Sequence, residues 1–369
     1  MGIDLTDIVR HFAFEGTYLG AEPLPSGHIN DTYAACFRRA GSATHRYLLQ
    51  RINHHVFRQP DRLMENIEGV TTHLSAKIAS TGGDPARETL NLVPTRCGTT
   101  LLHTSEGEYW RAALFIEGAR TYEIAEDLDH VYHVGRAFGR FQQGVSDFPA
   151  DQLHETIPDF HHTPKRFEAF LQAVERDACN RAYAVRDEIA FVERRAADTS
   201  VLLDLLAQGQ LPQRVTHNDT KFNNVMIDDE TGEGICVIDL DTVMPGLSLY
   251  DFGDAVRSGA NPAAEDEPDL DKVTIDLEIF DRLTWGYLDA ARDFLTPLEI
   301  EYLPFSAKLM TLECGMRFLT DHLNGDVYFR IHRQDHNLDR CRTQFKMVRD
   351  MEAAVDQMHQ IVARYACGR

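Results

Sequence analysis

Short runs of β-prone residues alternate with turns in the first third of the chain. One segment between them instead carries apolar residues at three- and four-residue spacing, which is the pattern of an amphipathic helix. That stripe consists of Leu63, Ile67, Val70, Leu74 and Ile78. The pattern predicts a small antiparallel-sheet lobe with one main helix packed on the sheet. The expected strands are residues 32–37, 46–52, 99–103 and 109–116.

Helical spacing dominates the rest of the chain. Apolar stripes run from Val131 to Val145 and from Phe167 to Val174. The sequence Thr296-Pro297-Leu298-Glu299 is a capping box with proline at the first helical position, and it predicts the start of a long helix toward Leu323. A final stripe between Met347 and Tyr365 predicts a helix that closes the chain. The second lobe is therefore expected to be larger and mostly helical.

Three β-prone runs interrupt these helices, at residues 214–217, 224–227 and 235–240. We expect them to form one small sheet inside the helical lobe. The sequence Asp229-Glu230-Thr231-Gly232 supplies a turn between the second and third runs. The loop at residues 218–223 then lies near the end of the third strand, where polar residues concentrate.

The composition fits a globular protein of two domains or of one large domain with two lobes. The chain has 369 residues, of which 43% are hydrophobic and 26% are charged, and these values exclude the disordered and fibrous classes. Its formal net charge is −21, which disfavours a nucleic-acid partner because the phosphates would be repelled. A small anionic ligand remains compatible with this charge where Mg²⁺ and a few arginines neutralise it locally.

The cysteines and the hydropathy predict a cytoplasmic protein. The seven cysteines form no CxxC pair, which is typical of reduced thiols. No stretch approaches the run of about 18 apolar residues that crosses a membrane, and the N-terminal region lacks the pattern of a secretory signal. We therefore expect neither export nor a membrane span.

Two stretches carry the polar residues that a phosphoryl-transfer site needs. The phosphate-binding GxxxxGK[ST] motif and the dinucleotide-binding GxGxxG motif are both absent from the sequence. The chain instead contains His217-Asn218-Asp219-Thr220-Lys221-Phe222-Asn223-Asn224, followed on the next β-prone run by Val237-Ile238-Asp239-Leu240-Asp241. Phosphoryl transfer needs a carboxylate near the acceptor hydroxyl, oxygen ligands for Mg²⁺, and donors for the phosphates. These two stretches can supply the first two requirements.

Each of the polar residues has an expected role. Asp219 lies in the loop after a strand and is the candidate base. Asn224 and Asp239 offer oxygen ligands to Mg²⁺ from the same crevice. Asp241 would point to the same face as Asp239 if the strand continued, so a second metal ligand and a supporting residue are both open interpretations. Asp251, in Tyr250-Asp251-Phe252-Gly253, follows a Pro-Gly loop, and we interpret it as a structural anchor for the catalytic loop.

Five segments carry a resemblance to a known family: Gly27–Asn30, His162–Phe167, Arg214–Asn224, Val243–Gly246 and Glu313–Leu319. The chain resembles the aminoglycoside phosphotransferase and choline kinase superfamily, and within it the resemblance is closest to the bacterial N-acetylhexosamine 1-kinases. This resemblance implies an α+β, two-lobed, protein-kinase-like fold. Residues 1–118 would form the N-terminal nucleotide-binding lobe, and residues 119–369 would form the helical lobe with the catalytic loop and the sugar site.

The resemblance also implies a reaction and its ligands. ATP and Mg²⁺ would serve to phosphorylate the anomeric hydroxyl of N-acetylglucosamine or N-acetylgalactosamine, giving the sugar 1-phosphate. Asp219 would act as the base and touch the sugar, while Asn224 and Asp239 would hold the metal. The loop that contains Gly27 would cover the phosphates. The further sugar contacts that it implies are His28, Arg317 and Tyr328.

The cation for the phosphates departs from the protein-kinase pattern, in which a strand lysine pairs with a helix glutamate. Gln50-Arg51 occupies that strand here. Arg51 can replace the lysine, bind phosphate with its planar fork and pair with Glu68 on the first helix. Gln50 can equally face the site, because a shift of one residue in register turns the neighbouring side chain to the opposite face.

Two other functions compete with the sugar kinase. The first keeps the fold and changes the acceptor to choline, another amino alcohol, an aminoglycoside or a different sugar. Cationic acceptors favour an acidic, aromatic pocket. The second is a non-catalytic nucleotide-binding module, against which the presence of Asp219, Asn224 and Asp239 argues.

Overall fold

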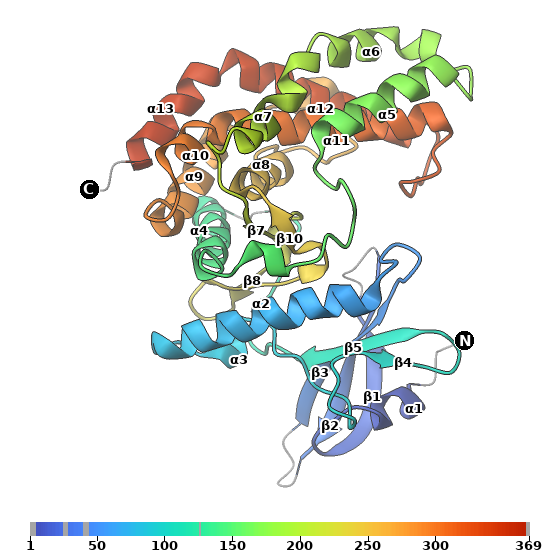
Figure 1. Cartoon of the computed structure of the whole chain (residues 1–369), viewed down its shortest axis with the longest axis vertical. Helices are drawn as coiled ribbons and strands as arrows, with labels where there is room; N and C mark the ends of the chain where they lie inside the picture. The colour runs from blue at the N-terminus through green and yellow to red at the C-terminus, as the bar shows by residue number, and fades with distance from the viewer. Residues whose placement is uncertain (1–4, 25–28, 40–43, 125–126, 367–369) are drawn as a thin grey trace.

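An antiparallel sheet forms most of the N-terminal lobe in the computed structural model, which describes residues 5–24, 29–39, 44–124 and 127–366. The strand order is β1-β2-β3-β5-β4 (Figure 1). The strands are β1 (Thr17–Pro23), β2 (Asp31–Arg38), β3 (Thr44–Ile52), β4 (Leu102–His103) and β5 (Tyr109–Leu114). Three of the predicted strands are confirmed, β1 was not predicted, and the run at 99–103 is a strand only in its last two residues. A turn in which the Thr95 N–H donates to the Thr99 carbonyl replaces the rest of that run.

The two faces of this sheet pack against different parts of the molecule. Tyr47 and Leu49 of β3 are buried with Phe12 and other residues of the N-terminal segment, which includes the short helix α1 (Thr6–Arg10). Ile52 belongs to the core that the sheet shares with the helices. Because side chains alternate along a strand, Gln50 shares the inner face with Ile52, and Arg51 shares the outer face with Leu49.

The main helix of the first lobe is α2 (Pro60–Ser80), which lies between the sheet and the helices of the second lobe (Figure 1). Its buried stripe includes Leu63, Ile67, Val70 and Leu74, as the spacing predicts. These side chains join the same apolar core as Phe138 in the second lobe. The helix thus packs on both lobes.

Asn66 ties α2 to the second lobe by hydrogen bonds. Its side-chain Nδ2 donates to the carbonyls of His154 and Val243 at 2.8 and 2.9 Å, and its Oδ1 accepts from the His154 N–H at 2.8 Å. Asn66 is 1% exposed, so these contacts are shielded from water. α2 is therefore attached to the second lobe as well as to the sheet of the first lobe.

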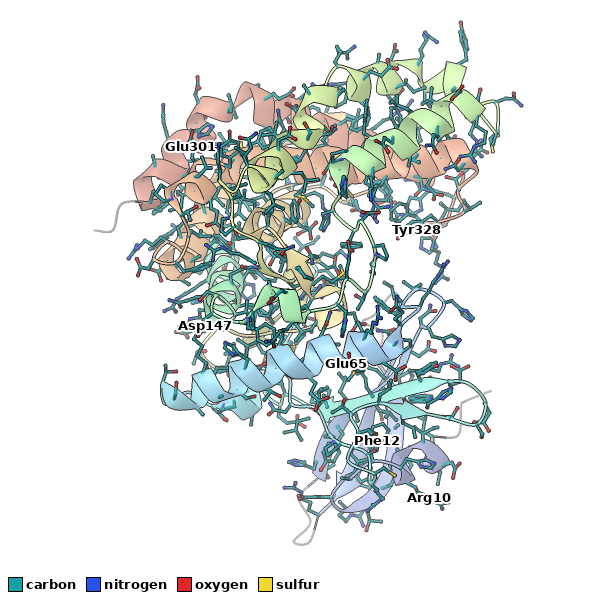
Figure 2. All side chains as sticks on the ribbon, viewed as in Figure 1. Arg10, Phe12, Glu65, Asp147, Glu301 and Tyr328 are labelled. Atoms are coloured by element: carbon teal, nitrogen blue, oxygen red, sulfur yellow. The ribbon has the colours of Figure 1, made fainter. Side chains whose placement is uncertain are left out.

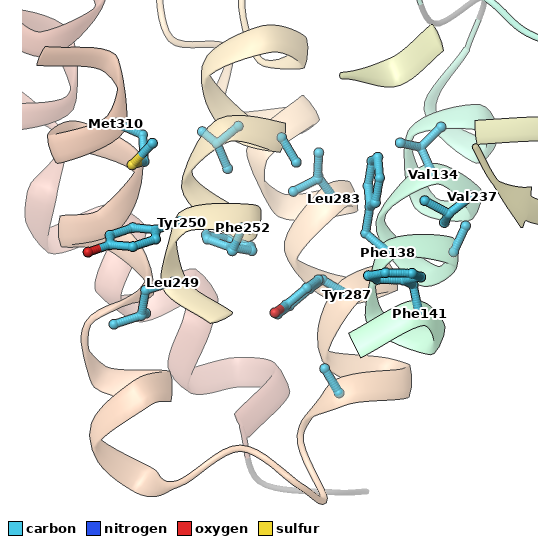
Figure 3. Close-up of a cluster of buried hydrophobic side chains, with 14 of the residues drawn as sticks. Val134, Phe138, Phe141, Val237, Leu249, Tyr250, Phe252, Leu283, Tyr287 and Met310 are labelled. Carbon is cyan, nitrogen blue, oxygen red and sulfur yellow. The ribbon is translucent and has the colours of Figure 1, made fainter. Parts of the chain in front are cut away.

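Helices make up most of the second lobe, as predicted. The pair α4 (Leu128–Gly144) and α9 (Leu277–Ala291) crosses so closely that a Cβ at Gly135 would overlap the carbonyl oxygen of Leu283. Figure 3 shows Tyr287 of this pair between Phe252 of α8 (Ser248–Gly259) and Phe138 of α4. The other helices are α3 (Pro85–Glu88) in the first lobe, and α5 (Thr163–Arg176), α6 (Arg186–Glu193) and α7 (Val201–Ala207). Short 3₁₀ turns are η1 (Ala150–Gln152), η2 (Ala182–Val185), η3 (Ala196–Ser200), η4 (Phe222–Asn224), η5 (Leu240–Thr242) and η6 (Leu270–Lys272).

The capping box at Thr296 is confirmed, but the long helix expected after it is two helices. α10 (Pro297–Glu301) ends at Tyr302, and α11 (Leu303–Asn324) begins immediately after it. Pro304 explains the break, because proline cannot donate the backbone hydrogen bond that would continue α10.

The closing helix is also divided, into α12 (His336–Ala353) and α13 (Val355–Ala366). The sequence at the break contains neither proline nor glycine. Tertiary packing distinguishes the two segments instead, because α12 lies along α11 whereas α13 lies along α9. Among the described residues, none of the helices combines the length and the apolar character needed to cross a membrane.

The small strands of the second lobe form two sheets, and the prediction of a single sheet was wrong. β7 (Arg214–Thr216) pairs with β10 (Met244–Gly246). β8 (Val225–Asp228) pairs with β9 (Gly234–Val237) and with β6 (Ala119–Arg120). β7 thus pairs with a segment later in the chain instead of with β8 or β9. The predicted turn after β8 is confirmed.

Candidate active site

The loop after β7 is held in place by the start of α8. The buried carboxylate of Asp251 accepts the backbone N–H groups of His217 at 2.9 Å and Asn218 at 2.8 Å. It also accepts a bond from the side chain of Gln142 on α4. Asn218 has a φ of +67°, a strained conformation that these bonds and its own side-chain bond to the Thr242 carbonyl maintain. The prediction that Asp251 anchors the loop is confirmed.

Asp219 projects from this loop beside a cation that the sequence reasoning missed. The Lys221 ammonium lies 2.7 Å from Asp219 Oδ1. Desolvation by the surrounding protein acts to raise the pKa of Asp219, but the charges of Lys221 and His217 outweigh it and hold that pKa below its usual range. Asp219 is therefore an ionised carboxylate at neutral pH, as a proton acceptor must be. The sequence did contain a signal for this ion pair, because Lys221 follows Asp219 by only two residues.

Asn224 and Asp239 lie close to this carboxylate. The Asn224 amide donates to the Asp219 carbonyl at 2.7 Å and to its carboxylate Oδ2 at 3.3 Å, which leaves the amide oxygen of Asn224 for another partner. Asp239 adopts a left-handed backbone with φ of +60°, and its side chain is accessible to solvent. No donor within the described ranges bonds to its carboxylate.

The charges around Asp239 fit a magnesium ion. Desolvation, followed by repulsion from the carboxylates of Asp241 and Asp219, raises the pKa of Asp239 to about 6. A cation bound there would relieve this repulsion. An amide oxygen and carboxylate oxygens are also the ligands that Mg²⁺ prefers. Asn224 and Asp239 would hold the ion.

Asp241 has partners of its own. The strand ends at Val237 and Asp241 lies in the 3₁₀ turn η5, so the condition under which Asp241 and Asp239 would share a strand face is not met. One carboxylate oxygen of Asp241 accepts from Nη1 of Arg111 on β5, and the other accepts from the side chain of Asn30 at 2.5 Å. Like Lys221, Arg111 was not predicted from the sequence. The signal for it was a single arginine inside an otherwise uncharged strand.

Arg51 and Glu68 do not pair with each other. Arg51 lies on the outer face of the sheet, where its Nε donates to Asp31 at 2.8 Å and its Nη1 lies 3.6 Å from Glu108. The carboxylate of Glu68 accepts a bond from Thr100 at 3.2 Å. The expected pair is therefore replaced by two separate sets of contacts, because the register of β3 turns Gln50 inward.

Arg317 and Tyr328 come together on the side of the second lobe that faces the sheet. Figure 2 shows Tyr328 at that side, on the loop that follows α11. The Arg317 guanidinium lies 5.6, 5.9 and 5.5 Å from the ring centres of Phe160, Tyr328 and Phe329. The predicted residues Gly27 and His28 lie outside the described residues.

A buried chain of hydrogen bonds joins α11 to the catalytic loop. Glu313 Oε1 lies 2.8 Å from His161 Nδ1, and His161 Nε2 lies 3.1 Å from the carbonyl oxygen of Asn218. Thr163 donates to the second oxygen of Glu313 at 2.5 Å. Burial acts to raise the pKa of Glu313, but the charge of His161 outweighs it and lowers that pKa. His161 thus lies between the carboxylate of Glu313 and the backbone of the catalytic loop.

The family is shown by a match over most of the chain. Residues 20–285 match the profile of a family described as the phosphotransferase enzyme family. The chain belongs to this phosphotransferase family. The predicted enzyme class is thereby confirmed.

Solved structures similar to this phosphotransferase share its two-lobed α+β fold, which confirms the fold prediction. An aminoglycoside phosphotransferase from Alicyclobacillus acidocaldarius is 11% identical, with a TM-score of 0.62 over 99% of this chain and 98% of that chain. A microcompartment-associated aminopropanol kinase is 14% identical, with a TM-score of 0.55 over 96% and 98%. A choline kinase from Cryptosporidium parvum is 13% identical, with a TM-score of 0.55 over 98% and 99%.

Proposed function

We propose that this phosphotransferase transfers the terminal phosphoryl group of ATP to the anomeric hydroxyl of an N-acetylhexosamine, with Mg²⁺ as the metal ion. The acceptors are N-acetylglucosamine and N-acetylgalactosamine. The observation that carries the choice of acceptor is the surroundings of Arg317. Its guanidinium faces three aromatic rings and has no carboxylate within ion-pair distance in the described part of the chain.

A second arginine strengthens this argument. Arg166 bonds to the Phe160 carbonyl, and its pKa is lowered, first by burial and then by the charge of Arg317. Two guanidinium groups repel a cationic acceptor such as choline or an aminoglycoside. A neutral sugar can stack its C–H groups on the rings and accept hydrogen bonds from the guanidinium groups through its hydroxyl and acetamide oxygens. We assign Arg317, Tyr328 and His28 to the sugar.

The remaining roles follow from the geometry around Asp219. Its carboxylate takes the proton of the attacking hydroxyl, while that oxygen forms the bond to phosphorus and the bond from phosphorus to the ADP oxygen breaks. Lys221 keeps the carboxylate ionised and adds positive charge where negative charge develops. Asn224 and Asp239 hold the metal ion, which when bound neutralises phosphate oxygens. Gly27 lies in the loop that we assign as the cover over the phosphates.

A panel of acceptors tests this function. ATP and Mg²⁺ are supplied with N-acetylglucosamine, N-acetylgalactosamine, glucose, galactose, choline and an aminoglycoside, and phosphorus NMR identifies the phosphorylated position. We expect an anomeric phosphate on the N-acetylhexosamines. Transfer only to choline or an aminoglycoside would reject the sugar assignment and leave the roles of Asp219, Asn224 and Asp239 in place.

The variant Asp219→Asn separates catalysis from binding. It removes the proton acceptor and keeps the size of the side chain, so we expect turnover to be lost while the protein stays folded and binds ATP. The measurement is the initial rate of ADP formation, with circular dichroism as the control for folding. A folded variant that keeps more than a small fraction of the rate would reject Asp219 as the base. Absence of turnover in the unaltered enzyme with every acceptor would favour a non-catalytic nucleotide-binding module.

A further inference from the structure

Arg111 is a buried cation on the inner face of the first-lobe sheet. It lies on β5 directly opposite Gln50 of β3, which in turn lies opposite Thr32 of β2. Arg111 is 6% exposed, and the rest of β5 is uncharged. A guanidinium group is rarely buried without specific partners, so its contacts indicate what it does.

Two contacts fix the plane of this guanidinium. Nε donates to the side-chain oxygen of Gln50 at 2.9 Å, and Nη1 donates to one carboxylate oxygen of Asp241. Gln50 is itself oriented by a bond of 3.1 Å from its amide to the Thr32 hydroxyl. Nη2 has no acceptor among the described residues. The guanidinium is therefore held through Nε and Nη1, while the N–H groups of Nη2 are available to donate.

The position of Arg111 brings those donors to the metal site. Asp241 is only two residues from Asp239 and lies across from Arg111 between the two lobes. The charge of Arg111 is also close enough to Asp239 to oppose the rise of its pKa. Asn30, which follows the loop that contains Gly27, bonds to the same carboxylate of Asp241. Strand β5, Asn30 and the segment that carries Asp239 thus meet at one buried ion pair.

Other arginines of the same sheet are committed elsewhere. Arg51 points to the outer face and bonds to Asp31. Arg46 shares the inner face with Gln50, but its Nε donates to Glu117 at 2.9 Å and its guanidinium lies over the ring of Phe115. Arg111 alone among these three combines a place beside the metal site with an unpaired donor edge.

We propose that Arg111 binds the phosphates of the nucleotide, filling from β5 the place that a lysine on β3 fills in protein kinases. The inference rests on the proposed use of ATP, and it is independent of which acceptor is used. Nη1 stays on Asp241 while Nη2 donates to phosphate oxygens. Asp241 and Gln50 then act as positioning residues, and both carboxylate oxygens of Asp241 are already occupied by Arg111 and Asn30 rather than by metal.

The test compares the binding of ATP with that of adenosine. Loss of Arg111 alone would leave the buried charge of Asp241 without its cation, so the main variant is the double change Arg111→Gln with Asp241→Asn, which leaves the net charge unchanged. We expect the Kd for ATP with Mg²⁺, measured by titration calorimetry, to rise about 10- to 100-fold. We expect the Kd for adenosine to stay within about twofold, because adenosine carries no phosphate.

A matched control removes the ion pair on the outer face by Arg51→Gln with Asp31→Asn, and we expect it to bind ATP as the unaltered protein does. An unchanged Kd for ATP in the Arg111 double variant would overturn the proposal, and so would an equal loss of ATP and adenosine. If that variant does not fold, Arg111→Lys replaces it, because lysine keeps the charge without the fork, and ATP but not adenosine should bind several-fold more weakly. Failure of the unaltered protein to bind ATP would reject the proposed function and this inference together.

Discussion

The ion pair between Asp219 and Lys221 is the arrangement closest to the proposed chemistry. The two groups lie 2.7 Å apart on one short loop, and the lowered pKa of Asp219 has Lys221 as its main favourable cause. A base with a low pKa stays ionised but accepts protons weakly. The pairing therefore matters more for the electrostatics of the transferring group than for the strength of the base.

The variant Lys221→Met tests this role. It keeps the apolar stem of the side chain and removes the charge, so we expect kcat to fall about 10- to 100-fold, as for loss of a charged hydrogen bond of about 1.5–3 kcal/mol. Steady-state rates check this. The control is Lys165→Met, which removes an exposed ion pair with Asp159 and should leave kcat unchanged. An equal kcat in the Lys221 variant would contradict the role.

At the scale of single residues, the sequence located together those polar residues that are close along the chain. Asp219, Asn224 and Asp239 fall within 21 consecutive residues, so spacing alone placed them in one crevice. Arg111 and Asp241 are 130 positions apart, and only the register of β3 with β5 and the packing of the two lobes bring them together. The sequence alone does not determine which side of a strand faces inward. For this reason it led to an expected pairing of Arg51 with Glu68 that the structure does not contain.

Between elements, the main link is the chain of bonds from α11 through His161 to the catalytic loop. Glu313 and His161 are both buried, and the Asn218 carbonyl that His161 contacts immediately precedes Asp219. The loop is thus held on one side by Asp251 and on the other by His161. Arg317 and Tyr328, which we assign to the sugar, lie on α11 and on the loop after it, so the proposed sugar site and the loop of Asp219 are attached to the same helix.

We predict that Glu313→Gln lowers kcat about tenfold without changing the Kd for ATP. The amide removes the charge that faces His161, and its nitrogen cannot accept the hydrogen bond that Thr163 donates to Glu313. Steady-state kinetics and ATP titration separate the two effects. The control is Glu175→Gln, because Glu175 is exposed on α5. A variant that loses stability but keeps kcat would assign Glu313 a purely structural role.

The boundaries of elements show where local sequence patterns were sufficient. Stripes and capping residues located α2, α4, α5 and α10, because each of these helices carries its signal in its own sequence. The division of α12 from α13 has no local signal, since it follows from packing on two different helices. The pairing of β7 with β10 and of β6 with β8 likewise depends on which strand edge is free in the folded chain.

For the molecule as a whole, the net charge is −21, and the stability of the fold depends on how its buried carboxylates are paired. Glu299 is 1% exposed and joins three elements: it completes the capping box of α10, bonds to Arg214 of β7 at 2.6 Å and accepts from Ser248 of α8 at 2.7 Å. Burial acts to raise the pKa of Glu299, but these bonds outweigh it and lower that pKa.

This lowered pKa predicts how stability changes with pH. The ionised form of Glu299 stabilises the fold above the usual pKa of a glutamate, and that contribution is lost as the pH falls through the lower pKa of the folded state. We expect Glu299→Gln to reduce the free energy of unfolding by about 3–5 kcal/mol at pH 7, as for a broken buried pair. The difference between the two proteins should shrink below about pH 4 in urea titrations. A difference that is independent of pH would contradict this account.

The anchoring of α2 by Asn66 has a consequence for how a nucleotide enters between the lobes. Since the helix shares its apolar core and its buried amide bonds with the second lobe, pulling it away would expose both. An opening that keeps these contacts would move the five strands relative to α2 and the second lobe. The ion pair of Arg111 with Asp241 joins the strands to the second lobe, so such an opening would break it, and the nucleotide of the proposed function would bind where it re-forms.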